Sequence, residues 1–326
     1  MSDTAQVTVL RRPFRFRPAY RVLKRTFLPR PFVHGLLSAA KRLTVRDQIR
    51  QRAALARQLG GQRATGIGLV ERDACQLFTP DELPGALEAA RHCSALFEAC
   101  RASGADSKLL QRNPHKAFLL SIVAANEFAK HPELLRFAVS RPLLDAATHY
   151  LGTVPVLEGI ALWWTPPNES TRSSQTWHID ELAPRQVKIL LNCLEVTADS
   201  GPLHFIPAAV SERCRQAVGH RRGRLADELI ERSGCAGHVR RATGPAGSGI
   251  IFDSSRCLHF GSRGNRRDRL VLTFHYLPLD APTETRYRLA LPALPGGCEN
   301  LDAMQRLALG FAPQAGNALP ADGAVR

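Results

Sequence analysis

The sequence lacks several features that would assign it to a particular class of protein. No apolar run is long enough to span a bilayer, and no secretory signal pattern stands at its start. The eight cysteines form no C-x-x-C pair and no other paired spacing, which argues against a zinc ribbon and a disulfide framework. The start is rich in Arg and poor in acidic residues, as in a transit peptide, but Arg is abundant throughout the chain. We therefore expect a cytoplasmic protein with reduced cysteines.

Acidic residues are scarce, chiefly at one end of the chain. The 326 residues hold 44 Lys and Arg against 29 Asp and Glu, a formal net charge of +15. Residues 1–60 alone hold 14 Lys and Arg against 2 acidic residues, so the remainder is nearly neutral. The sequence therefore predicts a basic N-terminal arm over 1–60, and we expect no nucleic-acid binding by the rest.

A basic helix is predicted within this arm, over residues 36–59. Arg42, Arg46 and Arg50 recur at four-residue spacing opposite a weak apolar stripe. Such a helix either packs on the rest of the chain with its basic face in solvent, or attaches to an anionic membrane surface or polyanion. We expect the first arrangement and keep membrane-surface contact as the alternative.

The patterning changes along the chain from helices to strands. Thr79, Pro80 and Glu82 are typical of a helix start with a capping box, and further helices are predicted at about 115–130 and 132–151. Short apolar segments separated by Gly, Pro and Ser turns then predict strands at 154–165, 176–180, 185–196, 201–208, 237–243, 248–253 and 268–278. This order predicts a mainly β protein with flanking helices, in which a barrel or jelly roll follows a helical N-terminal region.

An H-x-D pair, His178 and Asp180, stands at the head of one predicted strand. Alternate side chains of a strand point to one face, so the imidazole and the carboxylate would converge. They would supply two of the three ligands of a 2-His-1-carboxylate triad, which suits non-haem Fe(II) with open coordination positions. An isolated H-x-D often arises by chance, so its surroundings decide its weight.

Those surroundings contain further pieces in a fixed order. Trp177 precedes the pair, a G-P-L-x-F-I-P turn follows at 201–207, and His259 stands before a Gly-rich turn, ten residues ahead of Arg269. In these pieces, over roughly residues 110–278, the chain resembles the phytanoyl-CoA dioxygenase family of Fe(II)/2-oxoglutarate-dependent oxygenases. The resemblance implies a cupin-like jelly roll, a double-stranded β-helix, with the metal at its open end.

The same resemblance implies roles for individual residues. His178, Asp180 and His259 would be the catalytic Fe(II) ligands, and 2-oxoglutarate and O2 would take the remaining metal positions. Arg269 would bind the far carboxylate of 2-oxoglutarate, a bidentate task that suits a guanidinium. Related halogenases have a small residue in place of the carboxylate, so Asp180 implies hydroxylation or a related oxidation such as desaturation.

Alternation along the last predicted strand supports a site-lining role for Arg269. Arg269, Thr273 and His275 share one face with Val271, whereas the opposite face is wholly apolar. Arg266 and Arg267 are close enough to take the place of Arg269.

On the predicted strand 185–196, Lys188 and Asn192 likewise share a face, which makes them candidate cosubstrate contacts or supports for the metal ligands.

Other residues around the pair compete for the same roles. His204, His220 and His275 are rivals for the third ligand, but the resemblance favours His259. By alternation Trp177 points away from the metal side and belongs to the core, and Gln175 is also off the ligand face.

The jelly roll is predicted to be interrupted by a basic insertion at 211–236. The insertion holds Arg213, Arg215, His220, Arg221, Arg222 and Arg224. Such an insertion either acts as a lid that receives an anionic group of the substrate, or is a solvated surface loop. We therefore expect the catalytic domain over 61–283, with helices at 79–151, the jelly roll at 154–278 and this insertion, and a partly flexible extension over 284–326.

The sequence as a whole predicts an Fe(II)/2-oxoglutarate-dependent dioxygenase that hydroxylates a small organic molecule while 2-oxoglutarate becomes succinate. Two alternatives stay open. One is a jelly-roll protein that binds a ligand or partner without turnover, and the other is a cupin-type metalloenzyme that does not use 2-oxoglutarate. The substrate itself cannot be predicted, although the basic insertion favours an anionic one.

Overall fold

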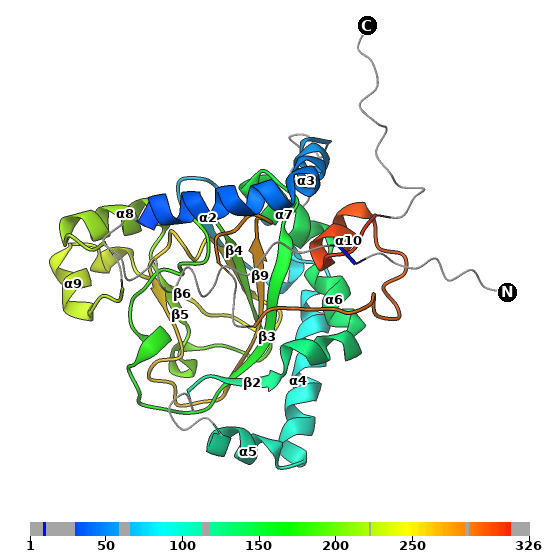
Figure 1. The fold of residues 1–326 in the computed structure, drawn as a ribbon. Helices are drawn as coiled ribbons and strands as arrows, with labels where there is room; N and C mark the ends of the chain where they lie inside the picture. Colours follow the sequence, from blue (N-terminus) through cyan, green and yellow to red (C-terminus); the bar gives the residue numbers. More distant parts are fainter. Residues whose placement is uncertain are drawn as a thin grey trace, which may run out of the picture.

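The strands form two antiparallel sheets in the computed structural model, which describes residues 9–10, 30–58, 66–112, 118–221, 223–283 and 287–313 (Figure 1). The strands are β1 (Cys75–Phe78), β2 (Leu120–Val123), β3 (Val156–Thr165), β4 (Val187–Asn192), β5 (Leu203–Phe205), β6 (Arg240–Ala242), β7 (Gly249–Phe252), β8 (His259–Phe260) and β9 (Arg269–Leu277). The helices are α2 (Arg30–Thr44), α3 (Arg46–Gln58), α4 (Ala86–Ala102), α5 (Ala105–Arg112), α6 (Pro132–Ala138), α7 (Arg141–Leu151), α8 (Ala208–Ala217), α9 (Asp227–Arg232) and α10 (Ala303–Leu309).

The large sheet has the strand order β1-β7-β4-β9-β3-β2, and the small sheet has the order β6-β5-β8. Every neighbouring pair is antiparallel. In Figure 1 the large sheet stands between α4, α6 and α10 on one side and the small sheet on the other. This confirms the predicted fold class, a two-sheet jelly-roll core with flanking helices.

The long strand β9 shows why the large sheet stands in this position. Leu270, Leu272, Phe274 and Tyr276 are fully buried on the face that meets the helices. The Phe274 ring packs 5.8 Å from that of Phe137 in α6. Each such side chain contributes about 1.5–3 kcal/mol by leaving water. The opposite face of β9, which carries Arg269 and His275, is thereby fixed toward the small sheet.

Every predicted strand segment except 176–180 contains an observed strand. At 176–180 the prediction is wrong, because the backbone forms only single bridges there, from Trp177 to Leu225 and from His178 to His259. The two bridging partners belong to different segments, so neither pairing continues into a ladder. Strands β1, β2 and β8 were not predicted.

The predicted helices differ from the observed ones in their breaks. The stretch 36–59 is wrong as a single helix, because α2 ends before Val45, whose side chain is buried against Leu279, and α3 then begins. The stretch 132–151 is also two helices, α6 and α7. Pro142 lies in the first turn of α7, and a proline begins a helix more readily than it continues one.

The predicted helix at 115–130 is wrong. Within it, residues 120–123 form β2, which pairs with β3, and Ala125–Lys130 form a 3-10 helix. Residues 115–117 of that prediction lie outside the described residues.

The capping box at Thr79 and Glu82 is present, since the Thr79 backbone N–H donates to Glu82 Oε2 at 2.7 Å. It caps a single 3-10 turn, however, and α4 begins only at Ala86.

The N-terminal helices pack on the rest of the chain, as expected for the first interpretation of the basic arm. Arg52 of α3 is 1% exposed, and its guanidinium donates to the carbonyl oxygens of Val154, Pro155 and Leu307 at 3.1, 3.0 and 2.7 Å. These bonds fasten α3 both to the strand region and to α10. The domain boundary predicted at residue 60 lies outside the described residues.

The C-terminal residues up to 313 also join the core. Leu307 and Phe311 are fully buried beside the large sheet. The flexibility expected for 284–326 falls partly on 284–286 and 314–326, which lie outside the described residues. All eight cysteines are free. No helix in the described ranges has both the length and the apolar character needed to cross a bilayer.

The described residues of the basic insertion at 211–236 form helices and their connections rather than a long irregular loop. It contains most of α8 and all of α9, whose apolar side chains join a satellite core with Trp177, Leu258 and Phe260. Trp177 is 3% exposed there, in accord with its predicted place in the core. The insertion is therefore packed against the segment that carries His178 and Asp180.

Candidate metal centre

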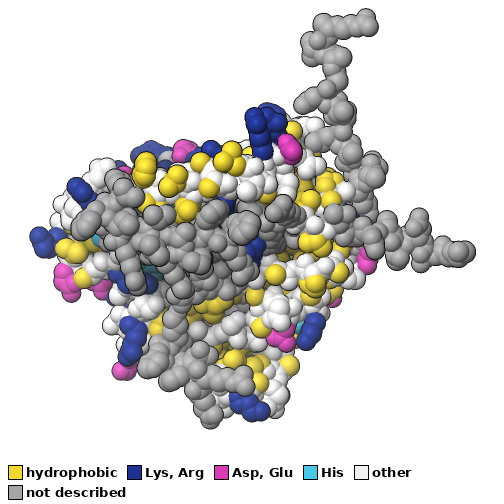
Figure 2. Space-filling view, viewed as in Figure 1, with side chains coloured by type: hydrophobic (Ala, Val, Ile, Leu, Met, Phe, Trp, Pro, Cys, Tyr) yellow, Lys and Arg dark blue, Asp and Glu magenta, His cyan; other side chains and the backbone are white. Residues whose placement is uncertain are grey.

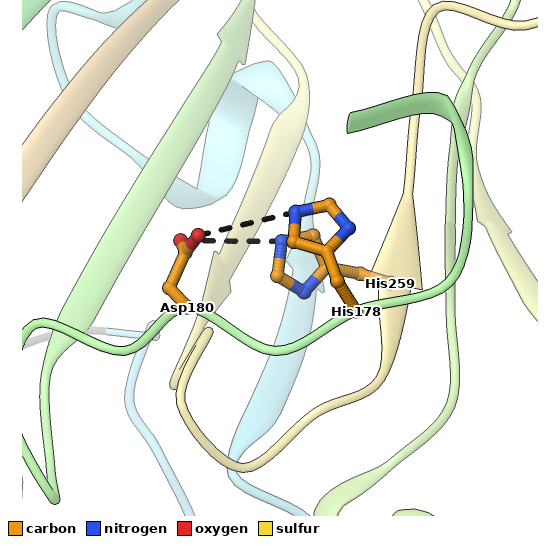
Figure 3. A group of neighbouring side chains, drawn as sticks. All are labelled: His178, Asp180 and His259. Atoms are coloured by element: carbon orange, nitrogen blue, oxygen red, sulfur yellow. Dashed lines mark ion pairs between the residues drawn. The ribbon is translucent and has the colours of Figure 1, made fainter. Parts of the chain in front are cut away.

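His178, Asp180 and His259 lie together between the two sheets (Figure 3). His178 and His259 exchange both backbone hydrogen bonds, N–H to O at 3.0 and 2.9 Å, so they are directly opposite each other. Residues paired in this way project their side chains from the same face, and the two rings lie 4.3 Å apart. The Asp180 carboxylate points at both rings, with Oδ1 3.9 Å from His178 Nε2 and Oδ2 4.0 Å from His259 Nε2.

Backbone carbonyls select the tautomer of both histidines. Nδ1 of His178 lies 2.8 Å from the carbonyl oxygen of Thr176, and Nδ1 of His259 lies 2.9 Å from that of Cys257. A carbonyl only accepts, so each Nδ1 carries the proton and donates it. The lone pair of each ring is then on Nε2, the atom that faces Asp180. Such an outer hydrogen bond is the usual way in which a metal-binding histidine is oriented.

The charges at this centre match those of metal ligands. Burial lowers the pKa of His178, and burial together with His178 lowers that of His259 to about 3, so both rings are neutral at pH 7. Burial alone would raise the pKa of Asp180. The Lys188 ammonium, 2.6 Å from Oδ2, opposes this effect, and Lys188 together with His259, His178 and His275 holds that pKa well below its usual range. Two neutral imidazoles and one carboxylate result, all with lone pairs available.

The separations are compatible with one shared ion. Two atoms bonded to the same metal at about 2.1 Å can be at most about 4.2 Å apart. Each histidine Nε2 has an Asp180 oxygen within this limit, Oδ1 at 3.9 Å for His178 and Oδ2 at 4.0 Å for His259. One ligand atom from each residue lies within 4.8 Å of the other two, so an inward shift of a few tenths of an ångström brings all three within reach of one ion. Two histidines and one carboxylate are the donor set of non-haem Fe(II) sites that keep positions open. The residues present therefore fit the implied metal.

Arg269, at the start of β9, is a buried cation whose Nη1 lies close to Gly261, two residues after His259. It is 4% exposed, and its Nη1 donates to Ser262 Oγ at 3.2 Å. Ser262 Oγ in turn lies 3.1 Å from Thr165 Oγ1, so neutral hydroxyls hold this end of the guanidinium. Among the described residues neither Nε nor Nη2 of Arg269 has a hydrogen-bond partner. Burial lowers the pKa of Arg269 to about 10, which leaves it charged at neutral pH.

The alternatives to Arg269 are placed differently. Arg266 and Arg267 are both exposed, on the turn that precedes β9. An exposed guanidinium is hydrated and gains little from binding a carboxylate, whereas a buried one has lost its water already. The geometry thus favours Arg269 over its neighbours.

The two predicted cosubstrate contacts on β4 already have partners within the chain. Lys188 Nζ donates to Asp180, and Asn192 Nδ2 donates to Ser248 Oγ at 3.1 Å. Lys188 is therefore placed to keep the candidate metal ligand ionised and oriented. A direct contact of either residue with a cosubstrate stays a prediction.

The rival histidines lie outside the group of three. His204 stacks on the Phe260 ring at 4.5 Å and 9°, with Nδ1 3.1 Å from the Pro202 carbonyl oxygen. His220 lies on the turn after α8. His275 is the register partner of Lys188 and is buried; its Nε2 has no hydrogen-bond partner within the described part of the chain. Burial, with Lys188, lowers the pKa of His275 to about 3.

Gln175 belongs to the scaffold around the centre rather than to the ligand set. It is fully buried, and its side-chain amide donates to Asn168 Oδ1 and to the carbonyl oxygen of Ser262. Because Ser262 also holds Arg269, Gln175 links the segment before His178 to the position of the guanidinium.

Arg224 is a basic residue of the insertion that the sequence predicted only as one of a set, with no position near the candidate ligands. Leu225 N–H donates to the Trp177 carbonyl oxygen at 2.9 Å, which fixes Arg224 beside the ligand-bearing segment. Arg224 Nη1 lies 3.5 Å from Thr176 Oγ1. Burial lowers the pKa of Arg224, while Asp180 and Glu181 act in the opposite direction. The sequence signal was present only as a general excess of Arg, and Arg222 lies outside the described residues.

A cavity of about 480 Å³ lies on another flank of the molecule. It is lined by α2, α3, residues 183–185 and residues 278–282. None of His178, Asp180, His259 and Arg269 lines it, so it is separate from the candidate metal centre.

Comparison with known proteins gives no family assignment. No protein-family model matches the chain, and no curated protein matches it in sequence. Among solved structures, it is similar to EctD from S. alaskensis with 2-oxoglutarate and 5-hydroxyectoine, at 18% identity and a TM-score of 0.48, over 69% of this chain and 82% of that one. It is also similar to AviO1 from Streptomyces viridochromogenes Tue57, at 15% identity and a TM-score of 0.42, over 72% and 98% of the two chains.

A third similar structure is SnoK, a non-haem α-ketoglutarate-dependent carbocyclase from nogalamycin biosynthesis. Its identity is 16% and its TM-score 0.41, over 78% of this chain and 96% of that one. Similarities at this level are too weak to support an activity or a substrate. What the site can do must therefore be judged from its own residues.

Proposed function

We propose that the protein is an Fe(II)/2-oxoglutarate-dependent dioxygenase that hydroxylates a small organic molecule. The observation that carries this proposal is Arg269, a buried guanidinium with two nitrogen atoms that have no partner among the described residues. A buried charge without a counter-ion is costly, so a protein that keeps one gains most when an anion binds there. A dicarboxylate that chelates a metal at one end and meets Arg269 at the other fits this arrangement.

His178, Asp180 and His259 would hold the Fe(II). When bound, the iron with 2-oxoglutarate and O2 supplies the oxidation: one oxygen atom enters a C–H bond of the substrate, and the other enters succinate as CO2 leaves. The remaining residues provide position and charge.

The protein's own groups prepare the centre before any ligand binds. The carbonyls of Thr176 and Cys257 hold both Nδ1 protons, so both Nε2 lone pairs face inward. Lys188 keeps Asp180 ionised. Such preorganisation means that little rearrangement is needed on binding.

The prime substrate is proposed to carry an anionic group. Arg224 supports this, because the bridge between Leu225 and Trp177 places its guanidinium beside the ligand-bearing segment, with Nη1 3.5 Å from Thr176 Oγ1. The resemblance to the phytanoyl-CoA dioxygenase family implies acyl-CoA esters, amino acids and secondary metabolites as compounds to screen. Compounds with a carboxylate or phosphate are expected to stimulate 2-oxoglutarate turnover most, and Arg224→Ala is expected to raise their KM.

The test of the proposal is formation of succinate from 2-oxoglutarate by the purified protein. We expect succinate to form only with Fe(II) and O2, to be lost in His178→Ala and Arg269→Met, and to persist in Arg267→Met. If Arg269→Met forms succinate as fast as wild type, the assigned cosubstrate site is excluded. Iron binding without decarboxylation would favour a cupin-type metalloenzyme of another kind, and absence of iron binding would favour a ligand-binding protein without turnover.

A further inference from the structure

An apolar stripe runs along the solvent side of α2. Phe32, Leu36 and Leu43 are 58%, 53% and 84% exposed. Their spacings of four and seven residues place them on one face of a helix with 3.6 residues per turn. In Figure 2 yellow side chains form a row over α2, and dark blue side chains lie at its α3 end. This group of three residues is called the α2 stripe below.

The α2 stripe cannot turn into the protein, because the opposite face of the helix is already fixed there. Val33 and Leu37 are 2% and 4% exposed. Lys41 on the same buried face donates from Nζ to the carbonyl oxygen of Ala281. A surface helix normally turns its polar face outward, so a second apolar face on the solvent side indicates a contact outside the chain.

The charge around α2 indicates what that contact is. Residues 1–58 hold 14 Lys and Arg against 2 acidic residues, whereas the rest of the chain is nearly neutral. Arg42, Arg46, Arg50 and Arg57 on α2 and α3 are all exposed. Arg42 pairs with Asp280, and Arg50 lies 3.9 Å from Asp47, so Arg46 and Arg57 are left with no ion pair among the described residues.

We propose that α2 docks the protein onto an anionic membrane surface. Phe32, Leu36 and Leu43 enter the boundary between headgroups and acyl chains, and the basic residues around them meet the anionic headgroups. Two copies of the chain would bring two strongly basic arms together and repel each other, so charge disfavours a homodimer through this face. A polyanion would use the arginines but would leave the α2 stripe in water.

This proposal does not depend on the chemistry of the metal centre. A peripheral enzyme held in this way would meet substrates that partition into the bilayer. The α2 stripe and the basic residues around it together supply the apolar area and the electrostatic attraction on which the membrane binding of such a helix depends.

The experiment is co-sedimentation of the full chain with vesicles. One set contains phosphatidylcholine with about 30% phosphatidylserine, and the other contains phosphatidylcholine alone. The variant Phe32→Ser/Leu36→Ser/Leu43→Ser removes the α2 stripe. Its matched control, Val70→Ser/Leu77→Ser, changes apolar residues that are 52% and 43% exposed on and before β1. Because all five side chains are exposed, both variants are expected to fold, which circular dichroism and Fe(II) binding will check.

We expect wild type and control to bind the anionic vesicles in about 0.1 M salt and to be weakened by about 0.5 M salt. The stripe variant is expected to bind about tenfold more weakly or worse. The proposal is overturned if the wild-type protein does not bind the anionic vesicles, or if it binds vesicles of phosphatidylcholine alone equally well. It is also overturned if the stripe variant binds as strongly as wild type. A wild-type dimer in light scattering that the stripe variant converts to monomer would make the face a self-association surface instead.

Discussion

Replacing Arg269 by Met should change ligand affinity and protein stability in opposite directions. The methionine side chain has a similar length and packs well in apolar surroundings, but it has no charge and no hydrogen-bond donor. We expect the variant to lose its affinity for 2-oxoglutarate while the ligand-free protein becomes slightly more stable.

The magnitudes follow from the contacts of the guanidinium. Nε and Nη2 can each give a carboxylate one charge-assisted hydrogen bond, worth about 1.5–3 kcal/mol. Losing both costs about 3 kcal/mol or more, or about a hundredfold in Kd. In the ligand-free protein, burial lowers the pKa of Arg269 from 12.5 to about 10, a penalty of about 3 kcal/mol for the charged form. Methionine removes that penalty but also the bond to Ser262, which leaves a net gain of about 2 kcal/mol.

The assay combines anaerobic calorimetry of 2-oxoglutarate binding to the Fe(II) protein with thermal unfolding of the metal-free protein. The control is Arg267→Met, an exposed arginine two residues away. The control should bind like wild type and unfold at the same temperature. In Arg269→Met a gain of about 2 kcal/mol should raise the Tm by a few degrees.

Two results would refute this reasoning. Unchanged affinity in Arg269→Met would show that the cosubstrate does not use this guanidinium. A marked fall in the Tm of the ligand-free variant would show that Nε and Nη2 have partners inside the protein, so that the buried charge is not awaiting a ligand.

Three further predictions concern the surroundings of the site. Lys188→Met removes the ammonium that keeps Asp180 ionised, and should weaken Fe(II) binding about tenfold at pH 7, with partial recovery at higher pH in a titration of metal affinity. His275 has a pKa of about 3 in the folded state, against about 6.5 unfolded, so its contribution to stability is lost as pH falls below 6.5. Urea unfolding of the metal-free protein should show a loss of stability between pH 7 and pH 5 that is about 2 kcal/mol smaller in His275→Gln than in wild type, because His259 and His178 still contribute in the variant. Gly249→Ala would place Cβ 2.1 Å from the carbonyl oxygen of Leu190, and should lower the unfolding free energy by about 3 kcal/mol or prevent folding.

Two sequence signals named the residues of the centre. His178, Asp180 and His259 were named together from the resemblance to a known oxygenase family, and alternation, a local rule, predicted the inward face of β9. His178 and Asp180 are two residues apart, and Arg269 and His275 share the inward face of β9 as alternation predicts. The structure brings His178 and Asp180 to His259, although a metal role for the three remains a proposal.

The means by which the centre is held could not be predicted. His178 does not lie in a strand; a single pair of backbone bonds to the distant His259 positions it. The link from Lys188 to Asp180 joins a sheet residue to a loop residue, and nothing in the local sequence indicates that they meet. Contacts between segments far apart in the chain leave no periodic signal.

The errors in the helical region have the same origin. Residues 118–130 have an apolar pattern compatible with a helix, but Leu120 pairs with Trp164 at the edge of the large sheet. An available strand edge supplies hydrogen bonds that override a weak helical preference. After residue 154, by contrast, six of the seven predicted strand segments contain an observed strand, because turn residues mark their ends; 176–180 and β8 are the exceptions.

The most direct test of the central claim is anaerobic visible spectroscopy of the metal-free protein after addition of Fe(II) and 2-oxoglutarate. Chelation of the 2-oxo acid by protein-bound Fe(II) gives a weak metal-to-ligand charge-transfer band. The account predicts that the band appears in wild type and Arg267→Met, is absent in His178→Ala and is strongly weakened in Arg269→Met. Iron binding with no such band in wild type would contradict it.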